Sequence, residues 1–226
     1  MTNVILLVLT VLLCGISFYL LVRDLKLHPN GKEVSVEVSY KDVFQKKVII
    51  YSVIMVVITI GAAVLYCIYY QDNSIFTNIK RLALLCLIWP LAYIDYTTFR
   101  IPNAFIIFGL VLRVAIFPFE LLFSTGSVWM TLLSEVIASA ALFIAAILCS
   151  IFVKDSIGFG DIKLFIVMGL YLSLDGIWGA IFLSLIVSFF VSLFLLVTKK
   201  KGRKDAIPFA PAIVVGTYLS VCLTGM

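Results

Sequence analysis

The run MTLLSEVIASAALFIAAILCSIFV at residues 130–153 decides the fold class of this chain. It is long enough to cross the hydrocarbon core of a bilayer as a helix, and its one charged residue is Glu135. With 63% hydrophobic and 13% charged residues, the chain lacks the polar surface that a soluble globule needs. We therefore predict an all-α, polytopic membrane protein with about eight transmembrane helices. The other apolar runs lie at 4–22, 48–70, 82–94, 104–123, 162–174, 177–198 and 207–224.

Lysine and arginine residues indicate how these helices are oriented. If the N-terminus lies outside, 14 of the 17 Lys and Arg residues fall in connections on the cytoplasmic side. Lys80 and Arg81 then lie in an outer loop and Arg113 within a span. Because cytoplasmic loops are enriched in basic residues, we predict an N-out, C-out topology. The net charge of +5 then reflects topology and an anionic inner leaflet, and it gives no reason to expect nucleic acid as a partner.

The pattern of runs divides the chain into two parts. Residues 1–79 are predicted to form two helices joined by a cytoplasmic loop at 23–47, and residues 80–226 to form a six-helix core. The first run is predicted to be a retained anchor instead of a signal peptide, because no basic residue precedes it and Arg23 follows it. Within the loop, the alternation from Val34 to Val38 predicts a short strand.

Two aspartates stand at the edges of apolar runs, Asp95 at the end of one and Asp161 at the start of another. Fourteen residues separate Asp95 from Arg81, and fourteen separate Asp161 from Asp175. At the helical rise, each carboxylate is predicted to lie about 21 Å from the outer boundary of a core roughly 30 Å thick. Both are thus expected at one depth near the cytoplasmic side, on facing helices, with a resting separation that substrate closes.

A pair of carboxylates at this depth predicts a site for acid–base chemistry. A carboxylate in hydrocarbon is costly, and such a residue marks a functional site. Two that share a site cannot both ionise easily, so one can activate water while the other protonates a carbonyl oxygen. Gly158 and Gly160 beside Asp161 allow the close backbone approach that such a site needs. The simpler interpretations are that Asp161 caps a helix starting at Ile162 and that Asp95 is an interfacial residue before a turn.

Other kinds of site find little support in the sequence. The five cysteines are scattered singly without a C-x-x-C pair, and the one histidine, His28, lies in a predicted turn, so we expect no metal and no cofactor. Gly158-x-Gly160 is not a dinucleotide fingerprint, because position 163 is lysine. The alternative class is a proton- or cation-coupled transporter that uses Asp95 and Asp161, although the chain shows no internal repeat.

Three motifs occur in order: Asp95 followed by Arg100-Ile101-Pro102-Asn103, then Gly158-Phe159-Gly160-Asp161-Ile162-Lys163-Leu164, then Ile207-Pro208-Phe209-Ala210-Pro211. Together they resemble the type IV prepilin peptidases, which are intramembrane aspartic proteases of the GxGD type. The resemblance covers about residues 80–224. It implies that Asp95 and Asp161 are the catalytic pair, supported by Gly158, Gly160, Lys163, Arg100, Pro102, Asn103 and Pro208.

The resemblance also implies a substrate and a location. Members of the family cleave the short basic leader of prepilin-like precursors at the cytoplasmic face of the cell membrane, so we expect such a preprotein and the lipid bilayer as partners. The sequence leaves the oligomeric state open. Bifunctional members carry a larger cytoplasmic domain with paired C-x-x-C motifs and also methylate the new N-terminus. Because the loop at 23–47 has no cysteine, methylation is not expected here.

Two structural expectations complete the sequence analysis. Arg113 lies in the middle of the run at 104–123, where an unpaired guanidinium is expensive. We predict that it pairs with Glu135 or with Glu120, which lies two turns away on the same face. We also predict an extended substrate that pairs with the strand edge at Val34 to Val38.

Overall fold

The computed structural model of this chain describes residues 2–28, 46–124, 126–152, 158–199 and 207–224. These residues form helices, and six of the helices in the described part are long and apolar enough to cross a membrane. The protein is thus a helical, multi-pass membrane protein, as predicted. The strand expected at Val34 to Val38 lies outside the described residues. The helices are α1 (Thr2–Leu27), α3 (Lys46–Tyr69), α4 (Ile75–Thr98), α5 (Asn103–Phe123), α6 (Val128–Phe152), α7 (Phe159–Val197) and the shorter α8 (Ala210–Thr224).

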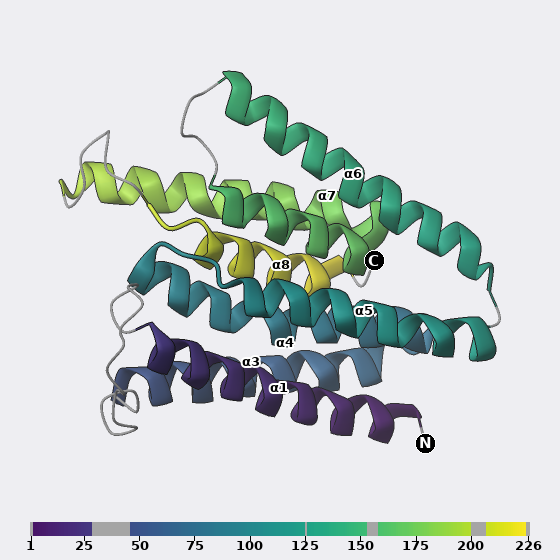
Figure 1. The fold of residues 1–226 in the computed structure, drawn as a ribbon. Coiled ribbons are helices and arrows are strands. Elements are labelled where there is room, and N and C mark those ends of the chain that lie inside the picture. Colours follow the sequence, from purple (N-terminus) through teal and green to yellow (C-terminus); the bar gives the residue numbers. More distant parts are fainter. Residues whose placement is uncertain (1, 29–45, 125, 153–157, 200–206, 225–226) are drawn as a thin grey trace.

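Helix α7 consists of two segments that run in opposite directions. Ser173 has φ 57° and ψ −175°, which is not a helical conformation. Ser139 of α6 donates to a backbone carbonyl of the first segment, whereas Ser184 of the second segment reaches a carbonyl of α8. Figure 1 shows the chain turning back between the two segments. The runs predicted at 162–174 and 177–198 are these segments, so each predicted run corresponds to a helical segment; the number that crosses the membrane stays a prediction.

Helix α4 begins earlier than the sequence predicts. The predicted helix covers 82–94 with Lys80 and Arg81 in an outer loop, but α4 starts at Ile75 and contains both residues. Their side chains are buried, because neighbouring helices bring carboxylates to Lys80 inside the bundle. The outer-loop placement of Lys80 and Arg81 was therefore wrong. The depth of about 21 Å for Asp95 was counted from that placement and stays a prediction.

Helix α4 forms the centre of the bundle. Its middle residues are almost completely buried, and it contacts α1, α3, α5, α7 and α8. Pairs of small residues bring other helices together: Gly169 lies against Ser139, and Gly216 lies against Ser184, with no room for a Cβ at either glycine. Such close contacts provide van der Waals packing where lipid gives helices little hydrophobic reason to associate.

The two N-terminal helices pack directly on the remainder of the bundle. Tyr66 of α3 and Tyr70, the residue after α3, donate hydrogen bonds to the backbone carbonyls of Val221 and Cys222 in α8. The beginning of α1 and the end of α8 lie at the same end of the molecule (Figure 1). The opposite end gathers the last turn of α4 and the first turns of α7 and α8, which carry the three motifs found in the sequence.

Candidate active site

Asp95 lies in the last turn of α4 and is 7% exposed. Its Oδ2 accepts a hydrogen bond of 2.9 Å from the backbone N–H of Ala210, the first residue of α8. Pro211 fits in the first turn of α8 because an N–H has no helical partner there. The carboxylate of Asp95 therefore meets the positive end of the α8 dipole, which favours negative charge.

Asp161 lies in the first turn of α7, which begins at Phe159 with Gly158 as the preceding cap residue. The helix therefore begins three residues before Ile162, where the simpler interpretation of Asp161 placed its start. The Asp161 carboxyl accepts a backbone hydrogen bond at Gly158, as the third residue of a helix does in a capping box. The simpler interpretation of Asp161 as a capping residue is thus partly right. Asp161 does bond the backbone at the start of α7, but it lies in the first turn and Gly158 holds the cap position.

The two carboxyl groups come from residues far apart in the sequence and lie close enough to interact electrostatically. Each stands at the N-terminus of a helix, α7 for Asp161 and α8 for Asp95. Unpaired peptide N–H groups at such ends stabilise negative charge by about 0.3–1 kcal/mol at exposed sites and by more in partly buried ones. This offsets part of the cost of placing two carboxyl groups together in a membrane protein.

The connection between α4 and α5 contacts the start of α7. A Cβ at Gly160 would lie 2.9 Å from Cβ of Ile101, so glycine is what allows this contact. Asn103, the first residue of α5, accepts at Oδ1 a hydrogen bond of 3.0 Å from Lys163 Nζ. The structure therefore brings Gly160, Lys163 and Asn103 together beside Asp161.

The other predicted supporting residues surround Asp95 less directly. Pro102 is buried and precedes α5 with an extended conformation, φ −66° and ψ 132°. Pro208 lines an apolar cavity of about 500 Å³ between the end of α4, the second segment of α7 and the start of α8. Arg100 turns away from both aspartates to bind Asp24 of α1. The sequence analysis did not identify Asp24. The one feature that could have pointed to it is its position as an acidic residue just after the apolar run at 4–22.

A cluster of four charged residues lies near the opposite end of α4 from Asp95. We call Lys80, Arg113, Glu120 and Glu135 the charge cluster; each is at most 5% exposed. Lys80 Nζ lies 2.9 Å from Glu120 and 2.6 Å from Glu135, and Arg113 Nη2 lies 2.8 Å and 2.6 Å from the same two carboxylates. The prediction that Arg113 pairs with Glu135 or Glu120 is confirmed, since it pairs with both. The participation of Lys80 was not predicted.

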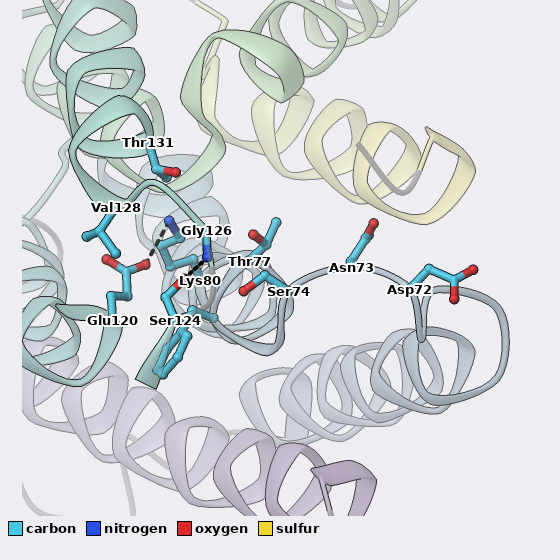
Figure 2. Close-up of a pocket in the computed structure, with 11 residues that line it drawn as sticks. Asp72, Asn73, Ser74, Thr77, Lys80, Glu120, Ser124, Gly126, Val128 and Thr131 are labelled. Carbon is cyan, nitrogen blue, oxygen red and sulfur yellow. Dashed lines mark hydrogen bonds and ion pairs between the residues drawn. The ribbon is translucent and has the colours of Figure 1, made fainter. Parts of the chain in front are cut away.

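A polar pocket of about 370 Å³ leads to this cluster. Figure 2 shows Lys80 and Glu120 joined by an ion pair, with Ser124 and Thr131 beside them and Asp72 away on the rim. Lys80 and Glu120, which line the pocket, are paired with each other, so this part of the pocket belongs to the structural charge cluster. No group of three or more His, Cys, Asp or Glu residues suited to a metal ion occurs in the part of the chain that the structure describes.

A helical membrane bundle that joins two carboxyl groups at two helix N-termini has the parts of an intramembrane acid–base site. Residues 82–197 match the type IV leader peptidase family, and the chain belongs to this family. It is also 31% identical over 83 residues to the prepilin leader peptidase/N-methyltransferase of Bacillus subtilis (strain 168). That alignment covers 37% of this chain and 33% of the relative, so the chain spans about a third of the length of the curated relative it matches. No solved structure matches the chain.

Proposed function

We propose that this protein is an intramembrane aspartic endopeptidase that removes the basic leader from prepilin-like precursors at the cytoplasmic face of the cell membrane. Membership of the type IV leader peptidase family supports the reaction class. The observation that carries the proposal is that the carboxyl groups of Asp95 and Asp161 lie within electrostatic range of each other. The Asp161 carboxyl lies in the first turn of α7, and the Asp95 carboxyl accepts a hydrogen bond from the first N–H of α8. We propose residues 80–226 as the peptidase core.

In the proposed reaction the two carboxyl groups share the proton transfers of amide hydrolysis. The ionised carboxylate takes a proton from water as the water oxygen attacks the scissile carbonyl carbon, and the protonated carboxyl gives its proton to the carbonyl oxygen. The tetrahedral intermediate then loses the amine: the C–N bond breaks, the carboxyl that took the water proton gives it to the leaving nitrogen, and the other carboxylate takes back one hydroxyl proton as the new carboxylic acid forms. Asp95 and Asp161 together supply both groups, and no further nucleophile is needed.

The proposed site fits a peptide that enters in an extended conformation. A helical substrate hides its scissile carbonyl in its own hydrogen-bond ladder, so the bond must be exposed before water can attack it. The cytoplasmic location rests on the distribution of basic residues along the sequence.

The direct test replaces each aspartate by the isosteric amide. We expect Asp95→Asn and Asp161→Asn each to lower the cleavage rate of a leader-bearing precursor by about 10²-fold or more in detergent, because each change removes one proton-transfer group. Cleavage is followed by gel shift and mass spectrometry.

Asp72→Asn and Asp175→Asn are the matched controls. Both carboxylates are exposed, and neither lies at the N-terminus of α7 or α8. These two variants should cleave at the wild-type rate. Substantial cleavage by Asp95→Asn or Asp161→Asn would remove that residue from the mechanism. A wild-type protein that cleaves no precursor but moves protons or cations in vesicles would favour the transporter instead.

We also propose that the chain cleaves without methylating the new N-terminus. The support is the sequence at 23–47, which has no cysteine, whereas the resemblance associates methylation with a domain carrying paired C-x-x-C motifs. The purified protein, incubated with precursor and S-adenosylmethionine, should yield a mature product of unmodified mass. A product heavier by one methyl group would contradict the proposal.

A further inference from the structure

Asp24 of α1 is a buried carboxylate outside the region that matches the family. It is 7% exposed, and the match begins only at residue 82. It lies in the last turns of α1 (Thr2–Leu27), where the helix dipole disfavours negative charge. A carboxylate in this position needs specific partners, because burial removes its hydration.

Its partners are two cationic or titratable side chains. Arg100 Nη2 lies 2.8 Å from one carboxylate oxygen of Asp24, and Nδ1 of His28 lies 3.5 Å from the other. His28 directly follows α1, whereas Arg100 belongs to the connection that follows α4. The pair Asp24–Arg100 therefore joins α1 to the segment that begins directly after the helix of Asp95.

That segment has an unusual conformation at its first residue. Phe99 has φ 52° and ψ 38°, a left-handed conformation that is unfavourable for a residue with a Cβ. Contacts on both sides hold the segment in place. Arg100 binds Asp24 on one side, and Ile101 packs on Gly160 while Asn103 binds Lys163 on the other.

We propose that Asp24 is a positioning residue for the pair Asp95 and Asp161. By fixing Arg100, Asp24 anchors residues 99–103, which are the connection after α4 and the first residue of α5. These residues link the last turn of α4 to the first turn of α7. Helix α1 then belongs to the working peptidase and is more than a membrane anchor. This inference rests on the proposed function, because it assigns a role in the same site.

The kinetic test uses the full chain and a leader-bearing precursor. We expect Asp24→Asn to lower kcat about tenfold or more, because a small displacement of reacting groups is costly, and to change KM less than about twofold. The exchanged pair Asp24→Arg with Arg100→Asp should recover part of the lost kcat. Asp72→Asn, an exposed carboxylate at the other end of the molecule, is the control and should match the wild type. An unchanged kcat, or a raised KM with kcat intact as expected if Asp24 binds the leader directly, would overturn the proposal.

A second measurement does not depend on catalysis. Hydrogen–deuterium exchange should be faster in Asp24→Asn at the amides of residues 96–105 and unchanged in α6 and α8. Faster exchange throughout the bundle would show a general loss of fold and overturn the positioning role. If the wild type cleaves no precursor, the proposed function fails, but this exchange pattern still shows whether Asp24 holds the connection.

Discussion

Gly160 shows how a single missing side chain shapes the proposed site. It packs against Ile101, and a Cβ there would lie 2.9 Å from that side chain. We predict that Gly160→Ala pushes residues 99–103 away from α7 and lowers peptidase activity by about tenfold or more, because small displacements near reacting groups are costly. The measurement is the initial rate of precursor cleavage at saturating substrate.

The control for this variant is Gly61→Ala in α3. A Cβ at Gly61 meets nothing within 4 Å, and alanine favours a helix over glycine by roughly 1 kcal/mol in helix interiors. Gly61→Ala should therefore keep full activity. If Gly160→Ala cleaves at the wild-type rate, the contact with Ile101 does not set the geometry of the site.

At the scale of elements, the charge cluster explains how α4 continues through a region with Lys80 and Arg81. Lys80 comes from α4, Arg113 and Glu120 from α5, and Glu135 from α6. Glu135 is fully buried and contacts both cations. We predict that Glu135→Gln destabilises the protein by about 3–5 kcal/mol, because two buried cations then share one carboxylate. Unfolding in SDS titrations measures this change.

Asp175→Asn provides the matched comparison for that measurement. Asp175 is exposed and lies in the second segment of α7, so its neutralisation should change the free energy of unfolding by less than about 0.5 kcal/mol. Equal unfolding curves for Glu135→Gln and Asp175→Asn would mean that the charge cluster does not hold α4, α5 and α6 together.

The same elements show what could be predicted from the sequence. Long apolar runs predict helices well, since a spanning helix must satisfy its backbone hydrogen bonds internally. The partners of Arg113 could be predicted because its neighbours in sequence offer few carboxylates. The helical placement of Lys80 could not, because its two carboxylates come from other helices.

The site itself was predicted unevenly for a similar reason. The sequence predicts Asp95, Asp161 and their motifs, but not that Ala210 donates its N–H to Asp95 across more than a hundred residues. It also gives no sign that Asp24 binds Arg100. Both contacts depend on how helices distant in the sequence pack together.

At the scale of the whole molecule, the reversal of α7 at Ser173 brings the functional parts to one end. The first segment of α7 starts with Asp161 at this end and runs away from it. The second segment returns the chain to the same end, so that α8 starts beside Asp95. One straight helix over Phe159–Val197 would span about 58 Å, far more than a bilayer core, and would leave Ala210 remote from Asp95.

This arrangement makes a testable prediction about topology. Asp72, in the connection between α3 and α4, and Thr198, after the second segment of α7, should lie on opposite sides of the membrane, with Asp72 outside. In a variant without the five native cysteines, Asp72→Cys should react with a membrane-impermeant maleimide in intact cells. Thr198→Cys should react only after permeabilisation. Labelling of both positions from outside would contradict the reversal of α7 within the membrane, and the opposite pattern would invert the proposed orientation and place Asp95 and Asp161 away from the cytoplasm.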